Sequence, residues 1–245
     1  MRAVLALMLG LGCAMAVEAE PRAECRQALA LGLDVSGSVD AREYRLQLDG
    51  LAKALTDPVV RAAFLQGPSV PVRLMVFEWS GLTDQRKLIG WQDITSATQL
   101  DRIATTLNTT TDRRTGDQPT ALAAAMVYGA QEALAQECWH PVLDISGDGP
   151  GNRGAHPGDL TADSLGTVVI NGLVIGPENR ANTTKNLRNV RTLEEHYRDY
   201  VIRGAGAFIE TALDYEDFAR AMRRKLLREI SPPALSWQGP AQRVQ

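Results

Sequence analysis

The sequence has little of several features that would assign a function directly. It has three histidines and three cysteines in 245 residues, and no His-Glu-x-x-His or cysteine-rich pattern that would indicate a zinc site. It also lacks the Gly-x-Ser-x-Gly turn of α/β-hydrolases, which argues against a serine hydrolase. Its formal net charge of −3 gives no basic surplus for a phosphate backbone, so we expect no nucleic-acid partner.

The sequence also lacks a long apolar run, except at the amino terminus. There, Arg2 supplies a positive charge, residues 3–17 are largely apolar, and small residues follow near the end of the run, which is the pattern of a secretory signal peptide. We expect cleavage after Ala16 or Ala19, with residues 1–19 forming the signal peptide and the mature protein periplasmic or secreted. No later segment is apolar enough to cross a bilayer, so we expect no membrane span in the mature chain.

Beyond the leader, short apolar runs alternate with amphipathic stretches. This alternation is typical of an α/β fold with a doubly wound, mostly parallel central sheet and helices on both faces. One domain over residues 25–230 accounts for the pattern. Pro232 and Pro233 end it, so residues 231–245 are expected to be a flexible C-terminal tail. The expected order of elements is β-α-β-β-α-α-β-α-β-α-β-α.

The expected strands are apolar runs bounded by turn residues. They cover residues 28–35, 72–79, 87–91, 142–146, 168–175 and 207–211. The second and third form a hairpin, so one edge strand is antiparallel. A first helix follows Asp40, which has the pattern of a capping box with Glu43. The other helices with expected bounds cover 97–107, 120–135, 193–201 and 216–230.

Polar residues end the first expected strand, at the edge where open α/β sheets bind ligands. Asp34, Ser36 and Ser38 alternate there, and Gly37 keeps the turn flexible, so their oxygens can point at one centre. Oxygen ligands suit a hard cation such as Mg²⁺, Mn²⁺ or Ca²⁺. The alternative is structural, with the serines capping the next helix and Asp34 accepting from backbone N–H groups.

Two more oxygen donors are expected at the same edge. Thr120 opens an apolar helix, and Asp148 follows the strand at 142–146. Together with residues 34–38, these positions resemble the metal-ion-dependent adhesion site of von Willebrand factor A-type (vWA) domains. The resemblance implies a divalent cation with one coordination position open to a carboxylate of a protein partner. The implied metal ligands are Asp34, Ser36, Ser38, Thr120 and Asp148.

The resemblance to vWA domains runs from about residue 28 to residue 230. Residues 143–150, 170–173 and 204–208 are similar to a group of exported bacterial vWA-related proteins classed as domain of unknown function 1194. Asp144 departs from the vWA pattern, because other members have an apolar residue there.

The vWA strand order also bears on the cysteines. Loss of the leader leaves Cys25 and Cys138 as a pair, and an oxidising compartment favours a disulfide between them. In that order, the first strand and the strand before Asp148 are parallel neighbours. Cys25 lies nine residues before Asp34 and Cys138 ten before Asp148, so both are expected near the opposite edge of the sheet. Adjacent strands lie about 4.8 Å apart, within reach of a disulfide, so we expect a Cys25–Cys138 bond rather than two free thiols.

The remaining ionisable residues are expected to be structural. His140 and His196 are isolated in the sequence, and His156 lies in the loop after Asp148, where it could contact the cation but is expected to be solvated. The basic residues of the last helix are expected to form its solvated face. They are Arg220, Arg223, Arg224, Lys225 and Arg228.

These features favour an exported binding module rather than an enzyme. The expected cofactor is a divalent cation, with Mg²⁺ as first choice and Mn²⁺ or Ca²⁺ as alternatives. The expected partner is a protein that supplies a carboxylate, and the oligomeric state stays open. One alternative is a metal-dependent hydrolase or phosphatase with Asp34 as nucleophile, but phosphatases of that kind need a second acid at the position of Ser36. The other alternative is a vWA scaffold with a non-functional metal site.

Overall fold

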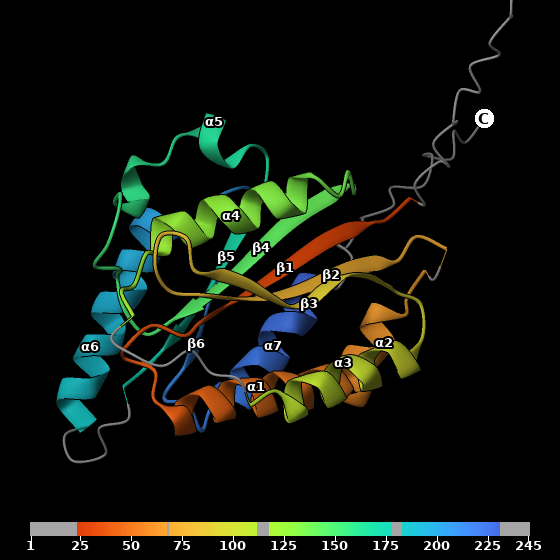
Figure 1. Ribbon diagram of the computed structural model, residues 1–245, viewed down its shortest axis with the longest axis horizontal. Helices are drawn as coiled ribbons and strands as arrows, with labels where there is room; N and C mark the ends of the chain where they lie inside the picture. The colour runs from red at the N-terminus through yellow and green to blue at the C-terminus, as the bar shows by residue number, and fades with distance from the viewer. Residues whose placement is uncertain (1–23, 68, 112–117, 178–182, 231–245) are drawn as a thin grey trace, which may run out of the picture.

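The chain is described by a computed structural model (Figure 1), which covers residues 24–67, 69–111, 118–177 and 183–230. The predicted signal peptide at 1–19 and the predicted tail at 231–245 lie outside these residues. Within the described ranges, no helix combines the length and the apolar character that crossing a membrane requires. All six predicted strands and the five predicted metal ligands fall inside them.

Six strands form one sheet in the order β3-β2-β1-β4-β5-β6. They are β1 (Gln27–Asp34), β2 (Val72–Trp79), β3 (Gln85–Ile94), β4 (His140–Gly147), β5 (Val169–Ile175) and β6 (Ile209–Ala212). The neighbouring strands β2, β1, β4, β5 and β6 run parallel to one another, whereas β3 at the edge is antiparallel to β2. The predicted doubly wound, mostly parallel sheet with one antiparallel edge strand is therefore confirmed.

Helices cover both faces of the sheet because its central strands are apolar on both sides. In β1, Leu29, Leu31 and Leu33 belong to one core, whereas Ala28 and Ala30 belong to the other. The first core is closed by α1 (Ala41–Thr56), α2 (Pro58–Phe64), α3 (Ala97–Thr109) and α7 (Phe218–Ile230). The second is closed by α4 (Leu122–Leu134), α5 (Ala162–Leu165) and α6 (Thr183–His196). Figure 1 shows α4 and α5 across the sheet from α1, α2 and α3.

The predicted capping box fixes the start of α1 just after the Asp34–Ser38 loop. The Asp40 carboxylate accepts from the N–H groups of Arg42 and Glu43 at 2.7 and 2.8 Å, and the Glu43 carboxylate accepts from the Asp40 N–H at 2.8 Å. These bonds satisfy N–H groups that have no partner within the helix. The end of β1 and the start of α1 are thus joined by a short, fixed turn.

Two helices, α6 and α2, differ most from the prediction. α6 starts at Thr183 rather than at residue 193, because its first turns are polar and its buried side chains, Val190 and Leu193, come late. Apolar spacing therefore gave no signal for its first half. The helix continues into a π-helical turn at Tyr197–Val201. α2 has no predicted counterpart, since a seven-residue helix is too short for periodicity, and Asp57 starts it by capping.

α4 begins at Leu122, two residues after the predicted start at Thr120. The N–H of Thr120 donates to the Asn152 side chain at 2.9 Å, and the N–H of Ala121 donates to the Ser80 carbonyl at 2.7 Å. These bonds hold Thr120 and Ala121 against two neighbouring loops instead of in the first helical turn. Thr120 therefore lies in the loop before the helix, not on it.

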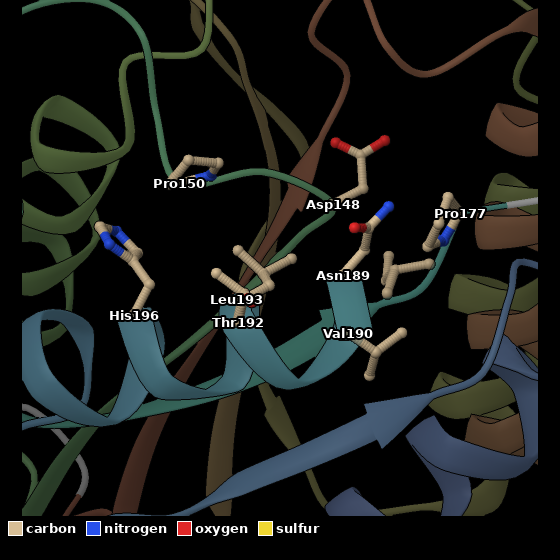
Figure 2. Close-up of a pocket in the computed structure, with 9 residues that line it drawn as sticks. Asp148, Pro150, Pro177, Asn189, Val190, Thr192, Leu193 and His196 are labelled. Atoms are coloured by element: carbon tan, nitrogen blue, oxygen red, sulfur yellow. The ribbon is translucent and has the colours of Figure 1, made fainter. Parts of the chain in front are cut away.

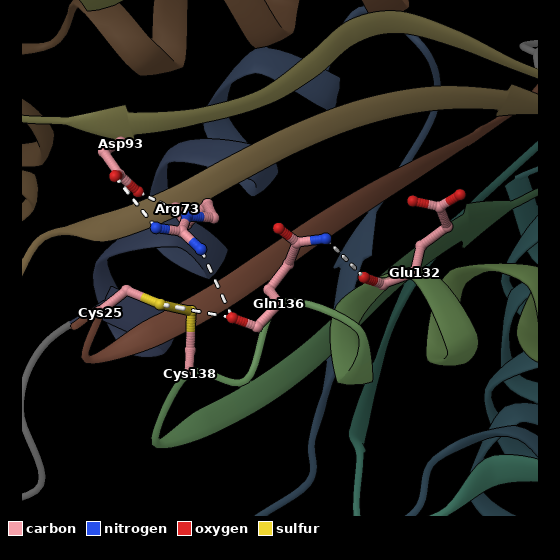
Figure 3. Close-up of a disulfide and its surroundings, with 6 residues drawn as sticks. All are labelled: Cys25, Arg73, Asp93, Glu132, Gln136 and Cys138. Carbon is pink, nitrogen blue, oxygen red and sulfur yellow. Dashed lines mark hydrogen bonds and ion pairs between the residues drawn. A yellow bond between two sulfur atoms is a disulfide. The ribbon is translucent and has the colours of Figure 1, made fainter. Parts of the chain in front are cut away.

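Cys25 and Cys138 form the predicted disulfide at the amino-terminal edge of the sheet (Figure 3). β1 pairs with β4 so that Gln27 lies opposite His140, and the same register places Cys25 opposite Cys138. Their Cα atoms lie 4.9 Å apart. The bond therefore ties β1 to β4 at the edge opposite the carboxyl ends of these strands.

Candidate metal centre

The candidate site lies where the order of strands changes direction. β2 and β3 lie on one side of β1, whereas β4, β5 and β6 lie on the other. Open α/β sheets bind ligands at the carboxyl ends of the strands that flank such a switch point. Asp34 is the last residue of β1, and Asp148 directly follows Gly147, the last residue of β4. The two carboxylates therefore lie on adjacent strands at the switch point.

Asp34 is fully buried, and its carboxylate is only half satisfied by the protein. Its Oδ1 atom accepts from the Ser36 N–H at 2.8 Å, and its backbone carbonyl accepts from the Gln47 side chain of α1 at 2.9 Å. Its Oδ2 atom is buried and has no hydrogen-bond partner among the described residues. Burial, with a smaller effect of the Asp148 carboxylate, raises the pKa of Asp34 to about 8.

Ser36, Ser38 and Asp148 form a chain of polar contacts next to Asp34. The Ser38 hydroxyl donates to Asp148 Oδ1 at 2.8 Å and lies 3.2 Å from the Ser36 hydroxyl. The Tyr215 hydroxyl donates to Asp148 Oδ2 at 3.2 Å. Burial raises the pKa of Asp148, although these two hydroxyls lower it. The structure thus brings four of the five predicted ligands together.

Thr120, the fifth predicted ligand, lies in the loop before α4. This loop is hydrogen-bonded both to the Ser36–Ser38 turn and to the loop after Asp148. The Gly37 N–H donates to the Gln118 carbonyl at 2.8 Å, which links this loop to the Ser36–Ser38 turn. The Asn152 N–H donates to the Thr120 carbonyl at 2.8 Å, which links it to the loop after Asp148. Thr120 is buried, but within the described residues no hydrogen bond joins its hydroxyl to the other four ligands. The backbone of Thr120 is therefore attached to the site, whereas its hydroxyl is not hydrogen-bonded to the other four predicted ligands within the described residues.

Gly147 leaves space beside the unpartnered oxygen of Asp34. A Cβ atom at this position would lie 2.6 Å from the Tyr197 hydroxyl, 3.2 Å from Asp34 Oδ2 and 3.4 Å from the Trp79 ring. The Tyr197 hydroxyl and Trp79 Nε1 are also buried without a hydrogen-bond partner among the described residues. Tyr197 was not predicted at the site, because it comes from the π-helical turn after α6.

The donor set fits a hard divalent cation. It consists of two carboxylates and two hydroxyls, and Mg²⁺, Mn²⁺ and Ca²⁺ prefer such oxygen ligands. Two carboxylates buried side by side repel each other, and a buried, unpartnered carboxylate oxygen such as Asp34 Oδ2 costs free energy unless a proton or cation balances it. A cation between Asp34 and Asp148 would remove both penalties.

A cavity of about 410 Å³ lies beside Asp148 (Figure 2). It is open to solvent on one side and bordered by the loop after β4, the end of β5 and helix α6, and its wall includes Asp148 and Pro150 from the loop. His196 of α6 also lines this cavity. His196 is isolated in the sequence, but its ring lies 5.5 Å from that of His156, which also contacts Tyr200. The loop after β4 and the end of α6 therefore pack through these aromatic rings.

The prediction that the basic residues of α7 form a solvated face is wrong for Lys225. Lys225 is fully buried, and its Nζ atom lies 3.0 Å from Asp144 of β4 and 2.9 Å from Glu229 of α7. The Asn171 side chain of β5 donates to Glu229 at 2.9 Å. Two carboxylates thus share one lysine, and burial together with Glu229 raises the pKa of Asp144 to about 8. Lys225 is buried because it pairs with Asp144 and Glu229. The helical spacing of α7 alone does not predict these pairs.

Comparison with known proteins supports this fold. The family model described as "Protein of unknown function (DUF1194)" matches residues 24–234. No curated protein matches the chain. Among solved structures, similar folds belong to vWA-domain proteins, and the likeness at these low identities shows the fold alone.

Three of these solved structures illustrate the similarity, in TM-score, identity and coverage. Proximal thread matrix protein 1 from the mussel byssus, with a zinc-occupied MIDAS motif, has a TM-score of 0.51 and 14% identity, over 85% of this chain and 48% of its own. The pilus adhesin SpaC from Lactobacillus rhamnosus GG has a TM-score of 0.56 and 12% identity, over 84% and 31%. An aerotolerance-related membrane protein from Bacteroides fragilis has a TM-score of 0.52 and 13% identity, over 81% and 98%. The chain thus spans less than half the length of the first two.

Proposed function

We propose that this chain, which belongs to the DUF1194 family and has a vWA-type fold, is an exported binding module that uses a divalent cation to engage a carboxylate on a protein partner. The cation would be held by the five residues predicted from the sequence. They are Asp34, Ser36, Ser38, Thr120 and Asp148.

The observation that carries the proposal is the buried pair of carboxylates at the end of β1 and β4. Asp34 and Asp148 share one site with two serine hydroxyls, and Asp34 Oδ2 has no partner among the described residues. Side chains that only cap a helix would direct their oxygens at N–H groups. In α1 that role belongs to Asp40, so the hydroxyls of Ser36 and Ser38 are not needed for it.

Other groups of the chain would position the two carboxylates that hold the ion. Ser38 and Tyr215 orient the two oxygens of Asp148, and the Ser36 N–H together with Gln47 fixes Asp34. When bound, the cation would supply positive charge and a coordination position that a carboxylate of the partner can fill. Mg²⁺ is the first choice because Mg²⁺ strongly prefers oxygen ligands, and Mn²⁺ and Ca²⁺ are the alternatives.

Two further observations support a binding role outside the cytoplasm. The Cys25–Cys138 disulfide suits an oxidising compartment, as does the predicted signal peptide. Structures of similar fold are described as a pilus adhesin and a minor pilin, whose names indicate roles in contact rather than catalysis. Partner and compartment remain part of the proposal.

The proposal is tested by adding Mg²⁺ to the purified protein and measuring its melting temperature. A ligand bound only by the folded state stabilises it by about 2.7 kcal/mol at 100 times its Kd. We expect Mg²⁺ to raise the melting temperature of the wild type and of Asp163→Asn, an exposed acid of α5, but not of Asp34→Asn. A response of Asp34→Asn equal to that of the wild type would exclude the site.

The enzyme alternative is separated by an activity assay. We expect no turnover of phosphate or acyl esters above trace level in the Mg²⁺-loaded protein. Hydrolysis that survives purification and is lost in Asp34→Asn would instead assign Asp34 as a nucleophile. A Mg²⁺ titration without any thermal shift in the wild type would favour the alternative of a scaffold with a non-functional site.

A further inference from the structure

We propose that the cavity beside Asp148 binds an apolar side chain of the partner, next to the acidic residue that reaches the cation. The inference rests on the proposed function, because it takes the cation at Asp148 as the anchor for the acid. It adds the chemistry of the partner: an acidic residue with an aliphatic neighbour in the sequence.

The position of the cavity joins it to the candidate site. Asp148 is part of the cavity wall and also accepts from the hydroxyl of Ser38 in the proposed ligand set. Figure 2 shows Asp148, Asn189 and Pro177 toward one end of the cavity and His196 at the other. A peptide whose carboxylate reaches the ion therefore passes the mouth of the cavity with its neighbouring residue.

The lining selects against a charged occupant. Most of it is apolar, from Pro150, Ile175, Pro177, Val190 and Leu193. A charged side chain would lose hydration there, whereas an aliphatic one gains about 25 cal/mol for each Å² that it removes from water. At about 410 Å³, the cavity is near the lower end of the range of about 300 to 1,000 Å³ for small-molecule sites. Its volume therefore exceeds that of one aliphatic side chain, and it can hold such a side chain together with adjoining groups of the peptide.

The charge around the cavity favours an acidic partner. Arg188 and Arg191 are exposed on α6, the helix that forms one wall, and Arg153 is exposed in the loop after Asp148, whereas one acid, Glu195, is exposed on the same helix. None of the three forms an ion pair with another described residue. Unpaired arginines raise the local concentration of acidic ligands, and their effect falls with salt. The three arginines outnumber this acid, so the charge near the cavity is compatible with an acidic peptide.

The test uses three capped peptides and the full protein with saturating Mg²⁺, with Kd measured by NMR titration. The peptides are acetyl-Gly-Leu-Asp-Leu-Gly-amide, the same peptide with glycine for both leucines, and the same peptide with asparagine for aspartate. We expect the leucine–aspartate peptide to bind about 10-fold more tightly than the glycine–aspartate peptide, because it buries an aliphatic side chain. The asparagine peptide should not bind.

Variants at the exposed rim fill the cavity without changing the core. Thr192 lines the cavity from an exposed position of α6, so Thr192→Trp should reduce the affinity for the leucine–aspartate peptide to that for the glycine peptide. The Kd for Mg²⁺ and for the glycine peptide should not change. Asn189→Trp, also at an exposed lining position, is a second, independent variant. Leu187→Trp, exposed on the same helix but outside the lining, is the control and should behave as the wild type.

The outcomes separate the two proposals. If both aspartate peptides bind equally and both lose binding in Asp34→Asn, the cavity has no role, and the proposed function stands. If the asparagine peptide binds without Mg²⁺, the cavity serves a metal-independent apolar ligand, which overturns this inference. If Mg²⁺ binds but neither aspartate peptide does, the inference is also wrong.

Discussion

Gly147 is the residue on which the shape of the site depends most directly. It lies at the end of β4, level with Asp34, since Gly32 pairs with Ile145 in the neighbouring strands. Any larger residue would enter the space between Asp34 Oδ2 and the Tyr197 hydroxyl. The two polar atoms can face the same point only because no side chain stands there.

Replacing Gly147 by alanine tests this reading. The new Cβ would lie 2.6 Å from the Tyr197 hydroxyl, so we expect a loss of about 1 to 3 kcal/mol in the free energy of unfolding, as for other overpacked sites. Tyr197→Phe in the Gly147→Ala background should restore part of the loss, because it removes the clashing oxygen. The control is Gly149→Ala, where a Cβ meets nothing within 4 Å. Urea denaturation measures all four proteins, and equal losses at the two glycines would contradict the argument.

At the residue scale, the sequence predicted those site residues that lie close together along the chain. Asp34, Ser36 and Ser38 lie within five residues, so their alternation shows that they can share a centre. Tyr197 and Tyr215 reach the site from distant helix ends and loops, and their identity as aromatic residues points first to packing. Contacts of that kind depend on the tertiary fold and leave no local pattern.

Among the elements, α7 and β4 are joined by charge as well as by apolar contact. Lys225 of α7 reaches across to Asp144 of β4, and both side chains are almost completely buried. Glu229, one helical turn after Lys225, makes the second ion pair. Removing one member of such a cluster leaves buried charge without compensation, which is more harmful than replacing the whole cluster.

We therefore expect Lys225→Met to destabilise the protein strongly, by about 3 to 5 kcal/mol, at a pH above 8, where Asp144 as well as Glu229 is charged. The comparison is Arg220→Met on the same helix, whose pair with Asp217 is exposed on the arginine side. Exposed pairs contribute little to stability, so Arg220→Met should lose far less than Lys225→Met. Chemical denaturation of the two variants gives the difference. A similar small loss in both would show that the buried pairs do not hold α7 on the sheet.

The same cluster predicts a pH dependence. The pKa of Asp144 is about 8 in the folded protein and 3.8 without the fold, so the folded state binds its proton more tightly. This contribution to stability is present at low pH, declines as pH rises from about 4 to about 8, and is constant above that.

Asp144→Asn cannot gain or lose this proton, so its stability relative to the wild type should rise between pH 4.5 and pH 8. Urea denaturation at several pH values measures it. Asp163→Asn, an exposed acid, should run parallel to the wild type. A constant difference between Asp144→Asn and the wild type over this range would refute the raised pKa.

At the scale of elements, the strands were easier to predict than the helices. The strand predicted at 72–79 has the bounds of β2, because a run of buried residues flanked by turn residues is visible in sequence. The first half of α6 has no apolar stripe, and Asp57 caps a helix too short for periodicity to detect. The position of Lys225 likewise depends on an acid 81 residues earlier in the chain.

At the scale of the whole molecule, the Cys25–Cys138 disulfide restricts the conformations of the unfolded chain as well as linking β1 to β4 in the folded protein. It joins residues 113 apart, and in the chain-entropy model a loop of that size contributes up to about 4 to 5 kcal/mol. The double variant Cys25→Ala/Cys138→Ala should therefore unfold at a clearly lower urea concentration than the oxidised wild type. Intact mass after alkylation without reductant is the accompanying check. Two alkylated thiols in the wild type exported to an oxidising compartment would show that the bond does not form.

The two margins of the sheet bear on whether the protein associates with copies of itself. A free strand edge can pair with another chain, and proteins counter this with short strands, charges and bulges. β6 has four residues, and β3 carries Arg86, Lys87 and Asp93 and pairs with β2 through register shifts. Neither margin offers a long, regular, uncharged template. The lateral growth that leads to aggregates is thus disfavoured, and the proposed function then leaves the end of the sheet with Asp34 and Asp148 as the place where another chain would bind.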